Sequence, residues 1–463
     1  MQENPAATVT PQKSKKVYDF TQGKMFKNIL LFSVPGLIIA VIQLVFDNVG
    51  TIVIGKTGTV YQAAVGASAP IISFGLSFLI HLGGGGGLAV AVAAGKGDEE
   101  KQNRIIHTSA MLSFSFGPFV ALLGNLLARP VLIAMDTPAE CLELAVTYVR
   151  VYFLCAPARL LYNFALSITR GLGDSKKPLR YVLAAGGVKM TTIFLTVLVL
   201  KWHVVGIAVS TVLAEYVAAV WGLADLKKGY GNVRWRLKET RFYGKDLVQI
   251  LCFGFPTVLA SWSLAFASLA MQSKINAYGA AAIAGSSVAA SVNSIVYLAS
   301  SAFSTTAGTF VGQNCGAKNY KRVRSGMFFI MGVTLLCALV STGFAVLFKE
   351  QVYGLFNRDP AVLEQAYLRM ENDLLHGSFL QVLANVYGMA LSGMGYAPLP
   401  MCTNLLSVAV NLVWVWAIYP LHPTLEFLYL VFPVTAVLTG AGDMLICHLL
   451  LRKQIKKGEN GQK

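Results

Sequence analysis

The stretch from Ile29 to Ile54, ILLFSVPGLIIAVIQLVFDNVGTIVI, restricts most strongly what this chain can fold into. Its 26 residues are almost wholly apolar. A helix of this length, at about 1.5 Å per residue, crosses a bilayer with some tilt. Asp47 interrupts the apolar run, with Gln43 four residues before it and Thr51 four residues after it. Residues four apart share one helix face, so these three form a polar stripe.

A carboxylate at the centre of a membrane is expensive, at about 2.5–3.5 kcal/mol on insertion scales. Such a residue usually faces a cavity or a partner, and it often carries transport chemistry. We therefore take Asp47, together with Gln43, Asn48 and Thr51, as candidates for binding a coupling ion, a proton or a substrate. A structural Asp47, hydrogen-bonded to a neighbouring helix, is the alternative.

The composition indicates an integral membrane protein, because 55% of the residues are hydrophobic and only 13% are charged. A soluble domain carries about 25% charged residues. The long apolar runs favour helices, since the strands of a membrane barrel would alternate every second residue. We predict an all-α, polytopic fold with twelve spans, near residues 29–54, 60–93, 105–135, 140–170, 178–200, 204–226, 247–276, 280–311, 325–348, 361–392, 397–420 and 427–451.

The basic residues predict how these spans are oriented. With both termini placed inside, 28 of the 38 Lys and Arg fall in inner segments and five in outer loops. This asymmetry is the positive-inside signal, and it predicts a multi-pass protein of the inner (plasma) membrane with both termini cytoplasmic. The net charge of +16 then reflects the anionic inner leaflet. We expect no nucleic-acid binding, because no basic-aromatic platform or known module is present.

An internal repeat organises the chain. Five short landmarks recur at nearly one offset: 32–35 with 253–256, 95–97 with 316–318, 137–139 with 359–361, 148–150 with 367–369, and 171–173 with 393–395. Six spans per unit return the chain to the same side, so the halves are parallel repeats. Transporters with such repeats bind substrate between or within the halves. The predicted division is a cytoplasmic tail (1–28), a six-helix bundle (29–226), a cytoplasmic connecting loop (227–246), a second six-helix bundle (247–451) and a second tail (452–463).

Several of these loops carry motifs that resemble one transporter family. They are GQNCGA at 312–317 with Arg322 downstream, AGKGD at 94–98, RGLGDSKKP at 170–178, and FTQG at 20–23. Over nearly its whole length the chain resembles the multidrug and toxic compound extrusion (MATE) transporters, and the last motif looks like their bacterial drug-efflux branch. The resemblance implies twelve helices in two bundles of six, and export of mostly cationic compounds in exchange for H⁺ or Na⁺.

The resemblance transfers unevenly to individual residues. Asn163 matches the family Asn of the fourth helix, and Thr211 matches the Thr of the sixth. The family's Asn-x-x-x-Asp pattern in the fifth helix falls on Lys189 and Ile193. Its first-helix Asp falls at Gly50, three residues after Asp47, and the seventh-helix Glu of one branch has no counterpart among residues 261–263. The usual cation site is therefore expected to be rearranged.

Further charges fall inside the predicted spans of the first half. Glu215 lies four residues after Thr211 on one face, either as a second cavity acid or as the partner of a buried cation. Arg159 is predicted to line the first-half cavity. Lys189 lies near mid-bilayer, so its ammonium needs an acidic partner, a wet cavity or deprotonation. Asp47 and Glu215 are the candidate partners for Lys189.

Two other features have structural explanations. The five glycines 83–87 are no phosphate loop, because no strand precedes them and no GK[ST] follows, so they indicate close helix packing or a kink. The seven cysteines form no CxxC pair and are interpreted as packing residues. The six histidines form no pair at metal-ligand spacing, so we expect no metal site.

The leading interpretation is a secondary active efflux transporter, an antiporter that exports small amphipathic, cationic compounds in exchange for H⁺ or Na⁺. A second keeps the fold and changes the cargo to an anionic or zwitterionic metabolite or a lipid-linked intermediate, which Lys189 and Arg159 favour. A membrane-embedded enzyme or receptor is the third, and no assembly of nucleophile, base and orienting residue supports it. We expect no cofactor beyond the coupling ion, and as partners a small-molecule substrate and the bilayer around a monomer.

Overall fold

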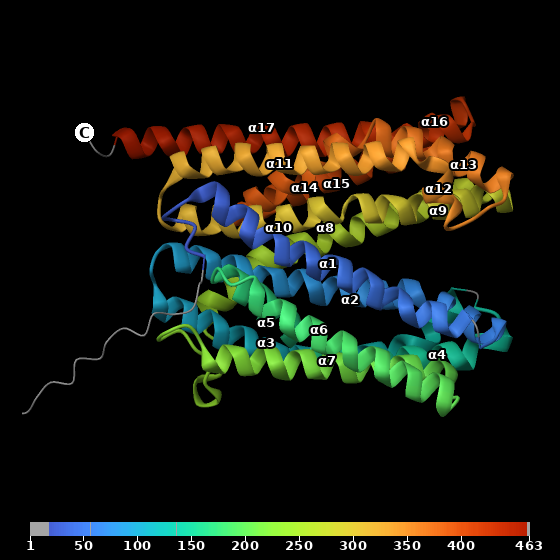
Figure 1. Ribbon diagram of the computed structural model, residues 1–463, viewed down its shortest axis with the longest axis horizontal. Coiled ribbons are helices and arrows are strands. Elements are labelled where there is room, and N and C mark those ends of the chain that lie inside the picture. The colour runs from blue at the N-terminus through green and yellow to red at the C-terminus, as the bar shows by residue number, and fades with distance from the viewer. Residues whose placement is uncertain (1–17, 56, 136, 461–463) are drawn as a thin grey trace, which may run out of the picture.

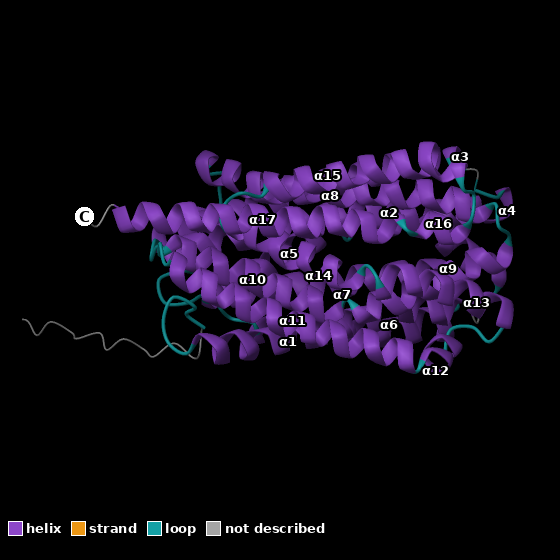
Figure 2. Ribbon diagram, turned by 90° about the horizontal axis from the view of Figure 1, so that it is seen from above, coloured by secondary structure: helices purple, strands orange, loops and turns teal. Residues whose placement is uncertain are grey.

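The structure is a computed structural model that describes residues 18–55, 57–135 and 137–460, without the side chains of Asp47, Asn48, Thr51, Ile52, Thr59, Ala280 and 458–460. Long, roughly parallel helices make up the molecule, with no strand in the described ranges (Figures 1 and 2). The all-α prediction is confirmed.

The described residues form twelve membrane spans when each bent helix pair is counted as one span, in agreement with the prediction. Nine are stretches that are long and apolar enough to cross a bilayer. Six of them lie in single helices: α1 (Met25–Gly55), α2 (Thr59–Gly95), α3 (Glu99–Ala134), α7 (His203–Lys228), α8 (Gly244–Asn276) and α11 (Tyr320–Leu347). The other three are α6 (Lys176–Ile193) extended to Val199, α15 (Pro398–Val413) extended to Leu421, and α17 (Val431–Asn460) extended back to Leu425. Three more are bent pairs: α4 (Ala139–Phe153) with α5 (Ala156–Gly171), α9 (Ala280–Val296) with α10 (Leu298–Gly316), and α13 (Pro360–Met370) with α14 (Ser378–Gly393). Shorter elements complete the chain: η1 (Phe194–Val199), η2 (Leu237–Glu239), α12 (Lys349–Gly354), η3 (Glu371–Leu375), η4 (Trp414–Ile418), η5 (Tyr419–Leu421) and α16 (Leu425–Tyr429).

The internal repeat extends to the backbone conformation. Gly97 and its equivalent Lys318 follow α2 and α10 and both have left-handed φ values, of 69° and 57°. Gly173 and Gly395, which follow α5 and α14, have φ values of 93° and 94°. A residue with a side chain rarely adopts this region, so Lys318 shows that the turn geometry is kept even where the glycine is lost.

The bends of the helices repeat only in part. The break between α4 and α5 turns the chain by 46°, and the equivalent break between α13 and α14 turns it by 49°. By contrast, α9 and α10 are bent by 45° at Tyr297, whereas their equivalent in the first half is the unbroken, 37-residue α2. The two halves therefore share a plan without being copies.

The first helix of the chain crosses between the two groups of helices. Near its start, the Ser33 hydroxyl lies 2.8 Å from the Thr306 hydroxyl of α10. Near its end, the ring of Phe46 occupies the place that a side chain at Gly186 of α6 would need. The start of α1 thus packs in the second half, and its end packs in the first.

The first helix of the second half, α8, also contacts both groups: its start packs against the first half and its end against the second. Its Asp246 accepts a 2.9 Å hydrogen bond from Arg104 of α3. A Cβ at Gly85 of α2 would lie 2.5 Å from the Ile250 carbonyl oxygen. At its far end, Met271 contacts Asn411 of α15 at 4.0 Å. The predicted bundle boundaries stay a prediction, and the packing shows that each first helix belongs to both groups.

The glycine run 83–87 packs closely against other helices, as predicted. A Cβ at Gly83 would lie 2.6 Å from the Cβ of Asn163 on α5, and one at Gly87 would lie 2.6 Å from the Ser167 carbonyl oxygen. Such distances admit no side chain. Small residues of this kind let helix backbones approach within a membrane.

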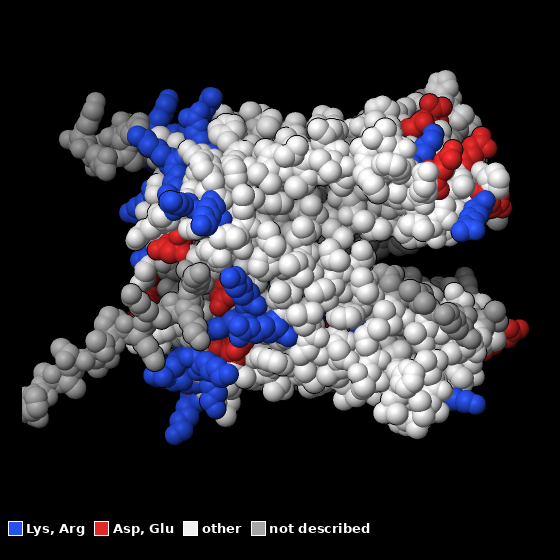
Figure 3. All heavy atoms as spheres, viewed as in Figure 1, with Lys and Arg blue, Asp and Glu red and all other residues white. Residues whose placement is uncertain are grey.

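Charge separates the two ends of the molecule. Lys and Arg gather at one end, drawn at the left of Figure 3, where α17 also ends and where some Asp and Glu lie among them; a second group of Asp and Glu lies at the opposite end, with fewer Lys and Arg. We call these the basic end and the acidic end. The two lobes are separated by a hollow at the acidic end and are in contact toward the basic end (Figure 3).

Candidate functional site

Five of the nine candidate residues lie on three neighbouring helices of the first half. Arg159 and Asn163 are on α5, Lys189 is on α6, and Thr211 and Glu215 are on α7. A cavity of about 240 Å³ lies among these helices, lined by Gly50, Val65, Ser73, Leu76, Tyr148, Tyr152, Arg159, Lys189, Ile207 and Thr211. The structure therefore brings Arg159, Lys189 and Thr211 together at one cavity, which we call the first-half cavity.

Glu215 is held beside this cavity by an ion pair with Arg159. The guanidinium donates to the carboxylate from α5 to α7, and the two side chains are only 14% and 12% exposed. Of the two alternatives for Glu215, the structure shows the partner of a buried cation, and that cation is Arg159. A pair at this depth is sensitive to substitution of either residue, because breaking a buried ion pair is strongly destabilising.

Asn163 and Gln43 serve the walls of the site. The Asn163 amide donates a 2.8 Å hydrogen bond to the carbonyl oxygen of Arg159, one turn earlier on α5. Gln43 of α1 donates to the Tyr162 hydroxyl at 3.0 Å and lines a smaller cavity with Arg170. Neither side chain lines the first-half cavity. The hydrogen bond of Asn163 lies within α5, and that of Gln43 joins α1 to α5.

Three candidates on α1 cannot be placed at the level of side chains. Asp47, Asn48 and Thr51 lie outside the described side chains. Their helix borders the first-half cavity, because Gly50 lines it and lies against Ile207 of α7. Their roles stay a prediction.

Two tyrosines of the cavity were missed from the sequence. Tyr148 and Tyr152 lie one turn apart on α4, with ring centroids 5.7 Å apart. The sequence did carry a signal, because Tyr148 begins one of the repeat landmarks and Tyr152 shares its helix face. Aromatic faces attract cations, so these rings suit a cationic or aromatic ligand.

A second buried polar cluster lies in the second half and was also missed. Arg369 donates to the Ser286 carbonyl oxygen of α9 at 3.0 Å. Its Nε lies 3.8 Å from Asp373, one turn later, and Asn293 of α9 donates to that carboxylate at 2.6 Å. Asp373 was the visible signal, as an acid inside the predicted span 361–392. This cluster joins α9 to α13 and η3.

Another buried acid lies on α17. Asp443 is 1% exposed, and the Thr403 hydroxyl of α15 donates to it at 2.8 Å. Among the described residues, no group of three His, Cys, Asp or Glu could hold a metal ion. The buried acids Glu215, Asp373 and Asp443 thus lie apart from one another, each with a polar partner from another helix.

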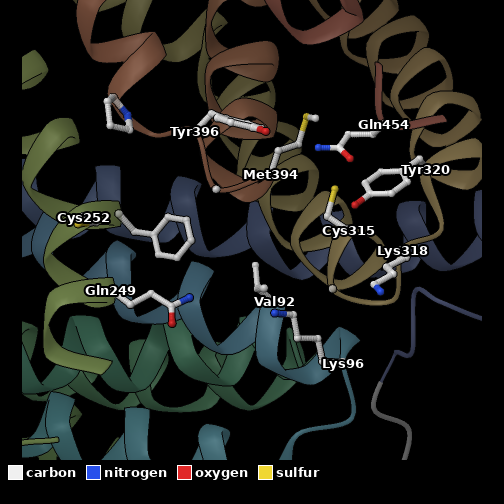
Figure 4. A pocket seen from close by; sticks show the side chains of 14 residues that line it. Val92, Lys96, Gln249, Cys252, Cys315, Lys318, Tyr320, Met394, Tyr396 and Gln454 are labelled. Carbon is white, nitrogen blue, oxygen red and sulfur yellow. The ribbon is translucent and has the colours of Figure 1, made fainter. Parts of the chain in front are cut away.

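A larger cavity, of about 600 Å³, opens at the basic end between the two halves. Lys96 and Lys318, both exposed, lie to one side of it, and Met394 and Tyr396 lie across from them (Figure 4). Its lining comes from α2, α8, α10, α11, α15 and α17 and the loops beside them. It lies beside the contact between the two halves, away from the first-half cavity.

The sequence matches the MatE family twice, over residues 35–198 and 256–417. The chain belongs to the MATE family. Each match covers one half, in agreement with the internal repeat. Membership makes this chain a MATE multidrug efflux transporter of bacterial type and a multi-pass membrane protein, and it excludes an enzyme.

Curated relatives cover most of this MATE transporter. The probable multidrug resistance protein YpnP of Bacillus subtilis is 29% identical over 358 residues, which is 73% of this chain and 79% of the relative. The multidrug export protein MepA of Staphylococcus saprophyticus is 23% identical over 392 residues, or 82% of this chain and 84% of the relative.

Solved structures share the fold. A MOP superfamily transporter from Pyrococcus furiosus, for which a reverse polarity of the binding pocket has been described, superposes with a TM-score of 0.88 at 20% identity, over 96% of this chain and 99% of that one. A multidrug resistance MATE family transporter in an outward-facing conformation superposes with a TM-score of 0.89 at 19% identity, over 96% and 99%. At this identity the likeness concerns the fold alone.

Proposed function

We propose that this MATE transporter is an antiporter that exports small amphipathic, cationic compounds in exchange for H⁺ or Na⁺. The observation that carries the proposal is the first-half cavity, where the Arg159–Glu215 ion pair lies beside Lys189 and Thr211. Ionisable groups inside a membrane mark ion and substrate pathways. The multidrug names of the relatives support the substrate class.

In this scheme the carboxyls of Glu215 and Asp47 are where the coupling ion binds. A proton on Glu215 would release the Arg159 guanidinium, and Na⁺ would be held by carboxylate, amide and hydroxyl oxygens from Asp47, Asn48, Thr51 and Glu215, since hard cations prefer oxygen ligands. The Lys189 ammonium occupies the space that a transported cation fills in relatives, and its deprotonation offers a second route for H⁺.

We propose a cytoplasmic location for both termini, in the plasma membrane, with the protein acting as a monomer. The gathering of Lys and Arg at one end supports this orientation, because an anionic inner leaflet attracts them (Figure 3). Labelling of single cysteines introduced at residues 227–245 is expected from the cytoplasmic side only. Labelling from outside would overturn the orientation.

Proteoliposomes with an imposed H⁺ or Na⁺ gradient test the proposal, with ethidium as a cationic cargo. We expect gradient-driven ethidium transport that Asp47→Asn and Glu215→Gln abolish while both variants still insert. Glu364→Gln is the matched control, because Glu364 is exposed on α13, away from the first-half cavity. Transport that is independent of either gradient, or unaffected by both substitutions, would refute the antiport scheme.

A second candidate is export of an anionic or zwitterionic metabolite or a lipid-linked intermediate on the same fold. It is favoured by two basic residues, Arg159 and Lys189, at one cavity. The same vesicles distinguish the two, because an organic anion would then be carried and ethidium would not.

A further inference from the structure

The two halves meet backbone to backbone at the basic end, between α2 and α10. A Cβ at Gly95 would lie 1.8 Å from the carbonyl oxygen of Gln313, and one at Gly316 would lie 2.2 Å from the carbonyl oxygen of Val92. Only glycine permits such an approach. This contact closes the basic end while the acidic end stays open (Figure 3).

Gln313 ties this contact to two other segments. It is 3% exposed, and its Nε2 donates a 2.9 Å hydrogen bond to the carbonyl oxygen of Gly171, at the end of α5 in the first half. Its Oε1 accepts a 3.0 Å bond from the backbone N–H of Phe20. One side chain of α10 therefore holds both the first half and the segment that precedes α1.

That segment, residues 18–23, is a strap across the basic end. Phe20 is fully buried, and its ring meets Phe32 and Phe310 edge to face at 5.1 Å and 5.6 Å. Its carbonyl oxygen accepts bonds from Asn314 at 3.2 Å and from Arg322 Nε at 2.8 Å. These contacts fasten the strap to α10 and α11 of the second half.

The strap reaches the first half as well. The backbone N–H of Tyr18 donates a 2.9 Å bond to the carbonyl oxygen of Gly173, two residues beyond the acceptor of Gln313. Arg322 also donates to the carbonyl oxygens of Gln22 and Gly23, each at 2.9 Å. Within the described ranges, the strap therefore makes several hydrogen bonds to the second half, whereas its bond to the first half is the one from Tyr18 to Gly173.

We propose that Gln313 and the strap form the gate that keeps the basic end closed, with Gln313 as its positioning residue. When the halves separate there, the bonds of Gln313 to Gly171 and of Tyr18 to Gly173 break, and the strap moves with α10 and α11. Among the described residues, no hydrogen bond joins α2 to α10 at the glycine contact, so the bonds of Gln313 to Gly171 and of Tyr18 to Gly173 are what hold the two halves together specifically. The gate rests on the chain being a transporter with two arrangements of its halves, and not on the cargo or the coupling ion proposed above.

Spin-label distances test the gate without substrate. One pair, at Glu140 of α4 and Glu364 of α13, reports the acidic end, and another, at Lys245 of α8 and Arg324 of α11, reports the basic end. All four positions are exposed. The labels are placed on a chain whose seven cysteines are replaced, in proteoliposomes, after its melting temperature is shown to match that of the natural chain.

Gln313→Glu is the deciding variant, because it keeps the acceptor for Phe20 and loses the donor to Gly171. We expect the population with a longer distance at the basic end and a shorter one at the acidic end to rise by roughly fivefold or more, because one net hydrogen bond is lost and the carboxylate also faces the Gly171 carbonyl oxygen. Phe20→Ala should increase the population that is open at the basic end further. Phe20→Leu should give a population between those of the unsubstituted protein and Phe20→Ala.

Gln22→Ala is the matched control, since its side chain is exposed and only its backbone carbonyl bonds to Arg322. Distances unchanged in Gln313→Glu, or changed equally in Gln22→Ala, would overturn the gate. If Phe20→Ala fails to fold, Gln313→Glu and Phe20→Leu still decide. If the unsubstituted protein does not transport ethidium but the variants change the spin-label distances as expected, only the antiport proposal is contradicted and the gate stands.

Discussion

Two equivalent arginines of the repeat lie in different surroundings. Arg150 is exposed on α4, and its Nε reaches only the Asn125 carbonyl oxygen, at 3.4 Å. Arg369 is 16% exposed on α13, between Ser286 and Asp373. The first half buries another arginine, Arg159, one helix later. The repeat therefore preserves backbone turns and helix order, while the buried charges have been placed independently in each half.

The two buried pairs also differ in what they join. Arg159 and Glu215 connect α5 to α7 beside a cavity, so a relative movement of those helices separates them. Arg369 and Asp373 lie one turn apart on the same span, so they move together. A pair that connects two helices can respond to conformation, whereas a pair within one turn stabilises a local structure. We expect the coupling chemistry in the first half for this reason.

The largest effect is expected at the pair between α5 and α7. Arg159→Gln or Glu215→Gln breaks a buried ion pair, at a cost of about 3–5 kcal/mol in unfolding free energy, and should abolish transport. The double variant should recover stability beyond the additive expectation, because neither charge then remains. Thermal unfolding in detergent and vesicle transport measure the two quantities. Strict additivity would show that the pair is not coupled.

An intermediate effect is expected at the pair within the second half. Arg369→Gln removes the donor to Ser286 and the neighbour of Asp373, and we expect a loss of about 2 kcal/mol in unfolding free energy. Asp373 keeps its bond from Asn293, which limits the loss. Transport should retain its ion dependence, measured in vesicles under H⁺ and Na⁺ gradients. A change of coupling ion would place coupling in the second half as well.

Much of the fold could be predicted because its signals are local. Apolar runs gave the twelve spans, and short motifs gave the repeat, since both depend on residues close in sequence. The partner of Glu215 could not be predicted in the same way. Spacing places Thr211 and Glu215 on one face of α7, but it says nothing of how α7 is rotated toward Arg159 or Lys189.

Two other features depend on long-range packing and escaped prediction. The crossing of α1 into the second half rests on contacts such as Ser33 with Thr306, 273 residues apart. The cluster of Arg369, Asp373 and Asn293 forms only because α9 packs against α13. In a single sequence, hydrophobicity and spacing do not reveal which helices pack together, because every helix of a membrane bundle is apolar on most faces.

A smaller effect is expected at the repeated left-handed turn. Gly97→Ala should lower the unfolding free energy by about 1 kcal/mol, because no atom lies near the added Cβ and only the backbone conformation is strained. Lys318→Gly should raise it by about 0.5 kcal/mol, as relief of strain is partly offset by a more flexible unfolded chain. Thermal unfolding checks both signs. Equal effects of the same sign would show that the two turns are not equivalent.

The smallest effect is expected at Arg150, and it tests the comparison most directly. Its side chain is exposed, and the hydrogen bond that its Nε donates to the Asn125 carbonyl oxygen is long at 3.4 Å. The stronger link between the two positions is the bond from the Asn125 amide to the Arg150 backbone carbonyl, at 3.2 Å, which substitution leaves in place. Arg150→Gln should therefore change the unfolding free energy by less than about 0.5 kcal/mol, with normal transport. Arg369→Gln, measured beside it, supplies the contrast, since the same substitution there removes a buried donor. If both variants lose the same stability, the repeat preserves the role of this arginine along with its position, and the independent placement of charge in the two halves is wrong.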